Sequence, residues 1–271
     1  MNIERYGSGD LDVPNPMRIE RAYDTLARGY DRYLARDAWI RQNLWRHFDR
    51  VFHAGQHVLE VGCGTGIDTI HLATRGIRIT AVDLSSKMLD ELRSKVSARS
   101  LSSLVDTRTG EACKVLPDLS GPFDGIVSSF AVLNMVDFGS YAKQAARLVR
   151  PGGRMVCHML SPGYVVRPAA QLARRFRGGS AHTDGATLRF GEESVQLTTL
   201  PAREIYQRFL AAHFVLRDAY PLGLLVTPRM ETWIPQPVLE TLGRVEAKLG
   251  SLSFLVSAGR FFVLDVERRH E

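Results

Sequence analysis

The chain has 271 residues, of which 45% are hydrophobic and 24% are charged. This composition is that of an ordinary globular protein and excludes a chain that is disordered along most of its length. The 35 lysine and arginine residues exceed the 29 acidic residues, so that the formal net charge is +6. Such a charge permits an anionic partner, whether nucleic acid, phospholipid surface or acidic substrate, but requires none of them.

The cysteines and the apolar segments indicate a cytoplasmic protein. Cys63, Cys113 and Cys157 are odd in number, lie far apart and form no CxxC pair, which argues against a disulfide framework and against a zinc site. We therefore predict no bound metal. Residues 1–12 carry charges where a signal peptide would have its apolar core, and no run of about 18 apolar residues exists that could span a membrane.

Strands and helices are predicted to alternate between residues 57 and 160. Residues 1–17 indicate a polar arm, and residues 18–53 indicate one or two helices. Apolar runs then predict strands, and helical periodicity predicts helices between them, the second starting at an N-cap formed by Ser85 or Ser86. The expected strands are 57–62, 77–83, 104–110, 123–130 and 154–160, and the expected helices are 67–75, 85–96 and 138–149. This alternation predicts an α/β fold with a doubly wound parallel sheet.

The pattern changes after Ser161. A basic segment (167–177) and a Gly/Ser-rich segment (178–185) are followed by a small hairpin around Gly191-Glu192, and later by a helix. Strands are expected at 214–220 and 261–269, on either side of a stretch with three prolines and a short helix. No repeat is present, so we predict one domain over residues 1–271. Its parts are an arm and helices (1–53), a ligand-binding core (54–160), an insertion (161–260) and a last strand (261–271).

A glycine-rich loop follows the first strand of the core and is the sharpest motif in the chain. Gly62, Gly64 and Gly66 come directly after Glu60 and Val61. Glycines permit a tight turn and close approach of a ligand, and the carboxyl end of such a strand is where open α/β sheets bind nucleotides. A turn without a ligand is the alternative. The dinucleotide spacing G-x-G-x-x-G would need glycine at the position of Ile67, and no P-loop lysine follows.

Two acidic residues extend the motif. Asp83 ends the second strand, where a carboxylate can accept hydrogen bonds from a ribose diol. Glu111 follows the third strand, where it can accept a hydrogen bond from an adenine amino group. The set indicates a site for an adenosine with a cationic or amino-bearing tail. The alternatives are that Asp83 is a helix N-cap and that Glu111 is a solvated loop residue.

Five segments together resemble the successive motifs of the class I S-adenosylmethionine-dependent methyltransferases. They are VLEVGCGTG (58–66), AVDLSSKML (81–89), GEA (110–112), FDGIVSSFAVLNMV (123–136) and LVRPGGRMV (148–156), and the resemblance extends over residues 18–160. It implies a Rossmann-like, seven-stranded sheet whose last hairpin, 214–220 with 261–269, is reversed, with N-terminal helices and an insertion after the fifth strand. It also implies S-adenosyl-L-methionine as the cofactor and S-adenosyl-L-homocysteine as the product.

The resemblance also implies roles for individual residues. Those expected to contact the cofactor are Glu60, Gly62, Cys63, Gly64 and Gly66 at the methionine moiety, Asp83 at the ribose, Leu84 and Met88 beside the adenine, Glu111 and the Ala112 amide at its edge, and Ser128 and Ser129 at the sulfonium. Glu111 stands where the family often has aspartate, which implies a longer contact. Met88 is open to a second interpretation as a core residue, and Cys63 to one as a buried filler.

The methyl acceptor is predicted by exclusion. Methyl transfer is an in-line displacement that depends mainly on orientation, and a base is needed only if the acceptor must lose a proton. Ser128-Ser129-Phe130-Ala131 stands where DNA amino-methyltransferases carry Asn/Asp-Pro-Pro-aromatic, and no Pro-Cys nucleophile or acidic metal cluster is found. We therefore expect a small-molecule or lipid-like acceptor and no nucleic acid. The alternatives are a reaction other than methylation and a non-catalytic adenosyl-binding subunit.

Three residues are candidates for moving protons or orienting the acceptor: Asn134, His158 and Tyr30. A core position for His158 and simple packing for Tyr30 are the alternatives. The expected acceptor walls are Tyr23, Tyr30, Tyr33 and Trp39, the insertion near Tyr164, and residues 220–229. The N-terminal segment and residues 161–190 are expected to form a lid. The basic run 167–177 is interpreted either as a solvated face or as a dock for an anionic membrane.

Overall fold

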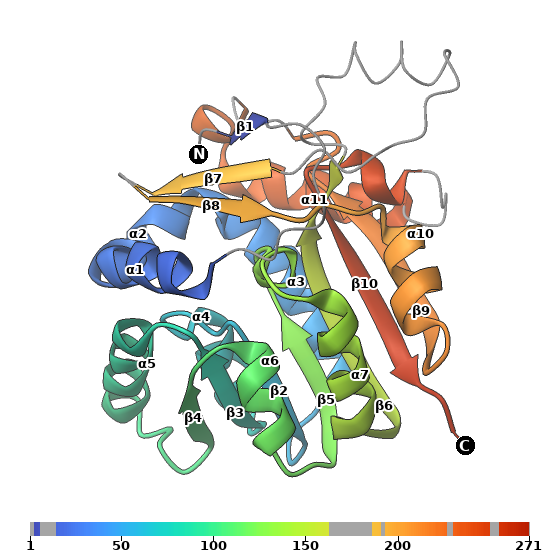
Figure 1. The fold of residues 1–271 in the computed structure, drawn as a ribbon. Coiled ribbons are helices and arrows are strands. Elements are labelled where there is room, and N and C mark those ends of the chain that lie inside the picture. Colours follow the sequence, from blue (N-terminus) through green and yellow to red (C-terminus); the bar gives the residue numbers. More distant parts are fainter. Residues whose placement is uncertain are drawn as a thin grey trace.

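The centre of the molecule is a seven-stranded sheet with the order β4-β3-β2-β5-β6-β10-β9 (Figure 1). The computed structural model describes residues 3–5, 15–162, 186–190, 193–226, 230–249 and 255–270. The strands of this sheet are β2 (His57–Val61), β3 (Arg78–Asp83), β4 (Val105–Thr109), β5 (Phe123–Ser128), β6 (Val149–Leu160), β9 (Phe214–Leu222) and β10 (Phe261–Arg268). β2 to β6 are parallel, and β10 is antiparallel to both of its neighbours. The predicted fold class, with its reversed last hairpin, is confirmed.

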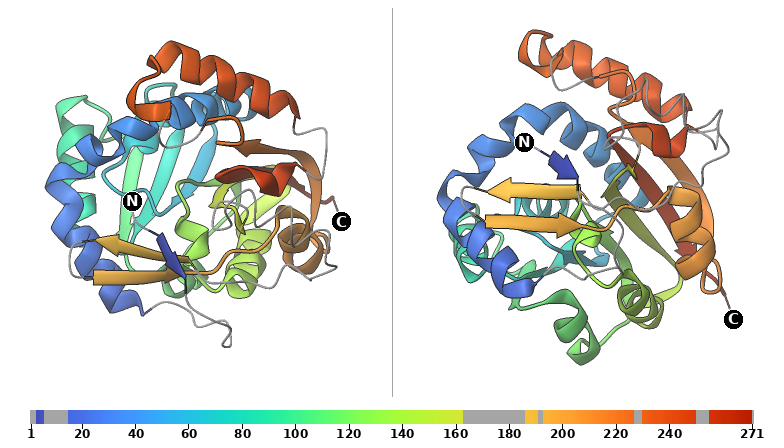
Figure 2. Two further views of the ribbon diagram at one scale, coloured as in Figure 1. Left: turned by 90° about the horizontal axis from the view of Figure 1, so that it is seen from above. Right: turned by 45° about the horizontal axis from the view of Figure 1, so that its top comes forward.

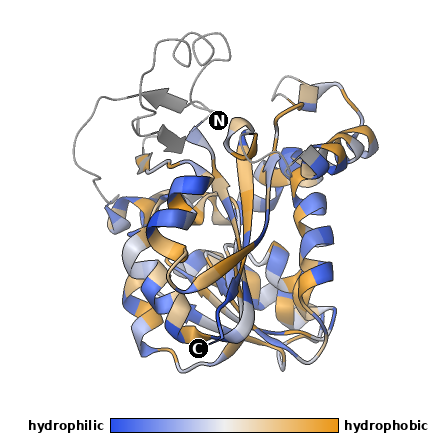
Figure 3. Ribbon diagram, turned by 90° about the vertical axis from the view of Figure 1, so that its right-hand side faces the viewer, coloured by the Kyte–Doolittle hydropathy of each residue, from blue (hydrophilic) through white to orange (hydrophobic). Residues whose placement is uncertain are grey.

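The helices cover both faces of the sheet (Figure 2). α3, α5 and α11 contribute to the hydrophobic core on one face, and α6, α7 and α10 to the core on the other. Since each inner strand is buried on both faces, it is a nearly continuous apolar run, and Figure 3 shows these hydrophobic strands between helices that carry hydrophilic residues. The helices are α1 (Pro16–Leu26), α2 (Tyr30–Leu34), α3 (Ala38–Val51), α4 (Ile67–Ala73), α5 (Ser86–Ala98), α6 (Ala112–Val115), α7 (Phe138–Leu148), α10 (Ala202–Ile205) and α11 (Gln236–Leu249).

The N-terminal region is more divided than the periodicity predicts. Residues 18–53 form α1, α2 and α3, joined by short 3-10 turns at Ala27–Gly29 and Ala35–Asp37. Gly29 precedes α2, in agreement with the weak helical propensity of glycine. At α5 the prediction is confirmed, since Ser85 is the N-cap and its hydroxyl accepts a hydrogen bond from the Met88 amide.

The strand β6 begins at Val149, five residues before the predicted start at Arg154. The predicted Pro-Gly-Gly turn forms an irregularity inside the strand, because the pairing jumps from Phe123 with Val149 to Gly125 with Arg154.

A small second sheet lies over the carboxyl ends of the parallel strands (Figures 1 and 2). It consists of β1 (Ile3–Arg5), β7 (Ala186–Phe190) and β8 (Glu193–Leu197), in the order β1-β7-β8. The hairpin β7–β8 is the predicted one. β1 is not predicted, since three residues in a polar arm carry no strand signal of their own and become a strand only by pairing with β7.

Several predictions concern residues outside the described part of the chain. Tyr164, the basic run 167–177, the Gly/Ser-rich segment 178–185 and residues 227–229 all lie outside it. Among the residues that are described, no helix has the length and apolar character needed to cross a bilayer.

Candidate active site

The glycine loop adopts a conformation that requires glycine. Gly62, Gly64 and Gly66 have φ angles of +74°, +54° and +80°, in the left-handed region that costs other residues energy. A Cβ atom on Gly62 would lie 2.3 Å from Cγ2 of Val132, and one on Gly66 would lie 2.0 Å from Cδ1 of Leu92. Two of the three glycines are thus fixed by packing as well as by the turn, whereas Gly64 faces the ring of Tyr30 at 3.4 Å.

Asp83 connects the loop to the end of β3. Its Oδ2 accepts a hydrogen bond from the Gly64 amide at 2.7 Å, and its Oδ1 accepts one from the Ser85 amide at 2.9 Å. Burial raises the pKa of this carboxyl from 3.8 to about 6, although the backbone donors oppose the change. The alternative of Asp83 as the helix N-cap is wrong, because Ser85 occupies that position.

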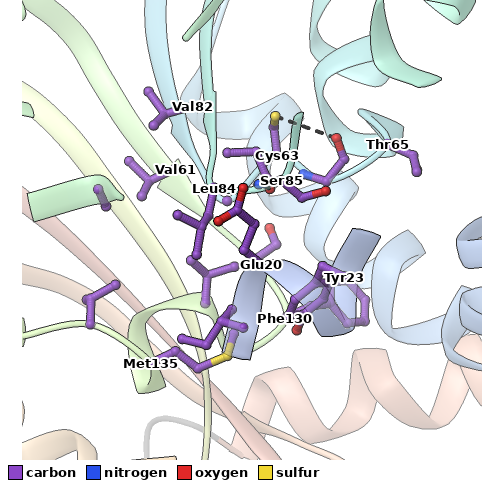
Figure 4. Close-up of a pocket in the computed structure, with 18 of the residues that line it drawn as sticks. Glu20, Tyr23, Val61, Cys63, Thr65, Val82, Leu84, Ser85, Phe130 and Met135 are labelled. Carbon is purple, nitrogen blue, oxygen red and sulfur yellow. Dashed lines mark hydrogen bonds between the residues drawn. The ribbon is translucent and has the colours of Figure 1, made fainter. Parts of the chain in front are cut away.

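A pocket, here called the cofactor pocket, opens between the glycine loop, the ends of β3 and β5, and the helix α1 (Figure 4). The structure brings most of the sequence-predicted residues to its wall. They are Gly62, Cys63, Gly64, Asp83, Leu84, Glu111, Ala112, Ser129 and Tyr30.

Four other residues of the predicted cofactor set lie behind this wall. Glu60 is buried and accepts a hydrogen bond from the Thr69 hydroxyl at 2.5 Å, and burial raises its pKa. Ser128 donates its hydroxyl hydrogen to the carbonyl of Val61 at 2.9 Å. Met88 is fully buried, which agrees with its alternative interpretation as a core residue. The fourth is Gly66, which precedes α4.

Cys63 and Glu111 are in the wall in modest roles. The Cys63 thiol donates to the carbonyl of Gly64 at 3.7 Å, and burial raises its pKa well above the usual range. It is therefore a protonated thiol rather than a nucleophile. The carboxylate of Glu111 forms an ion pair with Lys114 at 2.8 Å.

One polar group in the wall is without a partner in the described part of the chain. The hydroxyl of Ser129 is buried and makes no hydrogen bond. Since buried polar groups are normally satisfied, this hydroxyl is available to a bound molecule. The left-handed loop, the Asp83 carboxylate and the apolar side chains of Leu84, Val132 and Met135 complete a wall that fits an adenosine with a polar tail.

Sequence reasoning missed a charged pair at the glycine-loop end of the pocket. Arg41, on α3, contacts Oδ1 of Asp68 through Nη1 at 2.5 Å, and Trp45 donates to the same oxygen at 2.7 Å. The Arg41 guanidinium also lies 4.2 Å from the centre of the Phe130 ring. Glu20, on α1, was missed as well, and Figure 4 shows it directed into the pocket. Neither residue stands in a motif, because each comes from a helix outside the strand–loop pattern.

A second cavity, here called the aromatic cavity, adjoins the first. Its rings are those of Tyr23, Tyr30, Tyr33, Phe130 and Phe261. The first two tyrosines and Phe130 also line the cofactor pocket, so the two cavities share a wall. Burial raises the pKa of all three tyrosines, and their phenols are therefore neutral at physiological pH.

The charged residues at this cavity are balanced. Nη1 of Arg260 lies 3.1 Å from Oδ1 of Asp37 and 3.0 Å from Oε1 of Glu231. The same Glu231 oxygen accepts a hydrogen bond from the indole of Trp39 at 3.1 Å. Trp39 and Tyr220, both predicted as acceptor walls, are buried and line neither of the two cavities.

Of the three candidates for proton movement, only Tyr30 reaches a cavity. Asn134 is buried, donates to the carbonyls of Leu160 and Thr198 at 3.2 and 2.8 Å, and accepts from the Leu160 amide at 2.8 Å. Its amide is fully used in tying β6 to the segment after β8. Nδ1 of His158 accepts a hydrogen bond from the Phe130 amide at 3.0 Å.

The helices α1 and α2 are fastened over the cofactor pocket by two carboxylates. Asp24 accepts a hydrogen bond from the Ser85 hydroxyl at 2.5 Å. Asp31 accepts one from the Thr65 hydroxyl at 2.5 Å and forms an ion pair with Lys95 at 2.5 Å. Among the described residues, no group of three His, Cys, Asp or Glu side chains is placed so that it could bind a metal ion.

Comparison with known proteins gives the same assignment. Residues 58–153 match the model of a methyltransferase domain family. The CcbJ methyltransferase from Streptomyces caelestis has a TM-score of 0.60 at 19% identity and covers 92% of this chain and 98% of its own. The [4+2]-cyclase SpnF has a TM-score of 0.56 at 19% identity, covering 86% of this chain and 82% of its own. At these identities the two structures show the fold alone.

The matching methyltransferase domain over residues 58–153 and the fold agree with the predicted class I S-adenosylmethionine-dependent methyltransferase and its cofactor. Among its relatives is a demethylmenaquinone methyltransferase from Mycolicibacterium gilvum, 32% identical over 152 residues, or 55% of this chain. A ubiquinone/menaquinone biosynthesis C-methyltransferase from Geotalea daltonii is 29% identical over 145 residues, or 51% of this chain. The matches span 63% and 61% of the lengths of these two relatives.

Proposed function

We propose that this protein transfers the methyl group of S-adenosylmethionine to a small-molecule acceptor bound in the aromatic cavity, and releases S-adenosylhomocysteine. The observation that carries the proposal is the wall of Tyr23, Tyr30 and Phe130, which the cofactor pocket and the aromatic cavity have in common. Two ligands that meet at such a wall can be aligned for an in-line displacement.

The cofactor pocket supports specific roles in binding. Asp83 would accept hydrogen bonds from the ribose hydroxyls, Leu84 and Ala112 would contact the adenine, and Glu111 would accept from its amino group. The glycine loop and Arg41 would face the methionine end, where a guanidinium complements a carboxylate. When bound, S-adenosylmethionine supplies an electrophilic methyl group on a sulfonium.

The side chains near the shared wall would orient the acceptor, and the proton that the ring loses on methylation would pass to solvent rather than to one of them. Tyr30 is a neutral phenol whose pKa burial raises further. The amide of Asn134 is committed to backbone groups, and Nδ1 of His158 is committed to the Phe130 amide. The proposed catalysis therefore comes from alignment and from the exclusion of water by α1 and α2.

The aromatic cavity supports an uncharged aromatic acceptor. Five rings line it, and aromatic rings pack favourably against other rings. Arg260 is paired with two carboxylates, so that it offers little attraction to an acidic headgroup. Two relatives are a demethylmenaquinone methyltransferase and a ubiquinone/menaquinone biosynthesis C-methyltransferase, and these names agree with an acceptor of the quinone class. The contact of residues 167–177 with an anionic membrane stays a prediction, to be tested by salt-dependent sedimentation with anionic vesicles.

Two measurements test the proposal in sequence. S-adenosylmethionine and S-adenosylhomocysteine should each raise the melting temperature, since a ligand at 100 times its Kd adds about 2.7 kcal/mol to the unfolding free energy. Stabilisation by NAD but by neither of these ligands would refute the cofactor site. Label from methyl-tritiated S-adenosylmethionine should then appear in 1,4-naphthohydroquinone, used as a small hydroxylated probe, and not in a fatty acid such as decanoate.

The second measurement also separates the alternatives. Tight cofactor binding with no label transferred to any ring compound would favour either a reaction other than methylation or a non-catalytic role. The [4+2]-cyclase SpnF is an example of a protein with this fold whose name gives a different reaction. Consumption of an added substrate without loss of label from the cofactor would distinguish the first of these from the second.

A further inference from the structure

The segment that follows β5 contains an unusual backbone turn. Phe130 and Ala131 have φ angles of +55° and +66°. Both are L-residues with a Cβ atom, for which the left-handed region is unfavourable. Strained conformations of this kind persist only where the surroundings fix them, and they concentrate at functional sites. The turn lies at such a place, since Phe130 lines both the cofactor pocket and the aromatic cavity.

One residue of β6 holds both amides of this turn. Nδ1 of His158 accepts a hydrogen bond from the Phe130 amide at 3.0 Å, and its carbonyl accepts one from the Ala131 amide at 3.2 Å. The His158 ring also lies 5.1 Å from the Phe130 ring and 4.5 Å from the Phe261 ring. The imidazole thus contacts the turn through a hydrogen bond and through ring packing.

The state of the imidazole follows from this contact. Because Nδ1 is the acceptor, the hydrogen of the neutral ring is on Nε2. The side chain is 1% exposed, and Nε2 has no hydrogen-bond partner among the described residues. Leaving a buried donor unpaired is unfavourable. This tautomer is nevertheless favoured, because it allows Nδ1 to accept the hydrogen bond from the Phe130 amide.

We propose that His158 is a positioning residue that fixes the Phe130–Ala131 turn and thereby places the wall shared by the cofactor pocket and the aromatic cavity. Phe130 in turn packs against the Arg41 guanidinium, 4.2 Å from its ring centre. The effect of His158 on the turn is independent of the reaction, whereas its effect on turnover rests on the proposed function.

A role as a general base is incompatible with this geometry. The lone pair of Nδ1 is occupied, and Nε2 already carries a hydrogen. Burial lowers the pKa of His158 to about 3, and the charges of Arg41 and Arg260 add to the effect. Arg41 acts on the ring from α3 and Arg260 from the residue before β10, while Phe130 and Phe261 contribute uncharged rings.

The experiment compares His158→Asn with His158→Leu. The Asn Oδ1 atom can take the place of Nδ1, whereas Leu has no acceptor. In the ligand-free protein, hydrogen exchange of the Phe130 amide should become about tenfold faster or more in the Leu variant and stay within about threefold of wild type in the Asn variant. With 1,4-naphthohydroquinone as probe, kcat should fall about tenfold or more in the Leu variant only, and the Kd for S-adenosylhomocysteine should stay within about threefold of wild type in the Asn variant.

The outcomes separate a positioning role from the other possibilities. Loss of turnover in the Asn variant with Phe130 exchange unchanged would overturn the proposal in favour of a chemical role. Unchanged Phe130 exchange in the Leu variant would also overturn it, because it would show that His158 does not fix the turn. His57→Leu is the control. His57 lies at the start of β2 and contacts Thr80 on β3, so this variant should leave Phe130 exchange unaltered. If no probe is methylated by the wild-type protein, the proposed function fails while the exchange data still decide the role of His158.

A measurement on the wild-type protein guards against misfolded variants. The imidazole ¹⁵N resonances of His158 should show an unprotonated Nδ1 and a protonated Nε2 throughout pH 5–8. Titration of this ring within that range, or the opposite tautomer, would overturn the proposal.

Discussion

The two cavities are built in different ways. The glycine-loop side of the cofactor pocket is formed by main-chain geometry within residues 61–112, where left-handed glycines and the amides bound by Asp83 shape the loop. The aromatic cavity is formed by side chains from distant segments, since Tyr30 lies near the start of the chain and Phe261 near its end. The cofactor pocket is therefore sensitive to the identity of a few glycines, and the aromatic cavity, the proposed site of the acceptor, to the shape of its rings. This difference explains how one fold can keep a cofactor while its acceptors vary.

The largest expected effect is a glycine substitution in the cofactor loop. Gly66→Ala combines a left-handed backbone, which costs about 1–2 kcal/mol, with overlap against Leu92, which costs about 1–3 kcal/mol. We expect the unfolding free energy to fall by about 2–5 kcal/mol, measured by urea denaturation.

Two glycines outside the loop separate these causes. Gly55 has a φ of +85° but open space around it, and Gly29 has open space without a positive φ. Gly55→Ala should therefore show only the backbone cost, and Gly29→Ala should show neither. Equal stability losses at all three positions would contradict the distinction.

The next effect concerns the Asp83 carboxylate. Removing its charge in Asp83→Asn should weaken S-adenosylhomocysteine binding by about 10- to 150-fold, because hydrogen bonds to a charged group contribute about 1.5–3 kcal/mol. Isothermal titration calorimetry measures this change. Asp106→Asn, at an exposed position on β4, is the control and should bind like wild type.

The pH dependence provides an independent test of the same carboxylate. The pKa of Asp83 is raised from 3.8 to about 6, so the carboxyl group binds its proton more tightly in the folded protein than in the unfolded chain. The group therefore stabilises the ligand-free fold below about pH 4, and this contribution is lost as the pH rises through about 6. Ligand affinity should rise over the same interval, because the ribose hydroxyls donate to the ionised form. Asp83→Asn should remove both trends.

A smaller effect is expected at the aromatic cavity. Tyr30→Phe removes a phenolic hydroxyl from the shared wall and keeps the ring. The loss of one hydrogen bond of about 0.5–1.5 kcal/mol should raise the KM for 1,4-naphthohydroquinone by about two- to thirteenfold, with little change in kcat. A fall in kcat of a hundredfold or more would instead identify Tyr30 as a group that transfers a proton. Thr25→Val, on an exposed turn of α1, serves as the control.

The smallest effect is expected at the carboxylate that fastens α2. Asp31→Asn removes the charge that pairs with Lys95, and exposed pairs contribute about 0.2–1 kcal/mol. Thermal denaturation should show a slight loss of stability that disappears at high salt. A loss that persists in high salt would show that the neutral hydrogen bond to Thr65 is the main contact.

Sequence reasoning succeeded where the local pattern determines the structure. The strands, the Ser85 cap and the position of Asp83 follow from apolar runs and short spacings. Met88 shows the limit of this approach, since helical spacing places it beside the pocket motif but cannot tell which face of α5 meets the core.

The aromatic cavity was only partly predictable. Tyr23, Tyr30 and Tyr33 were identified from the predicted helical stretch 18–53, but Trp39 of the same stretch is buried and donates a hydrogen bond to Glu231 instead. Phe130 lies within a recognised motif, yet its left-handed backbone depends on His158, which is 28 residues away in sequence. Contacts of this kind depend on tertiary packing, which has no short-range signature.

The antiparallel course of β10 has a consequence for the order in which the protein is made. Because β10 runs opposite to β6, its first residue, Phe261, pairs with Leu160 at the edge where the parallel strands end. In the described part of the chain, every residue that lines the cofactor pocket is numbered 136 or lower, and so precedes Phe261 by more than a hundred positions. On the ribosome these residues are therefore synthesised well before Arg260 and Phe261 can close the aromatic cavity.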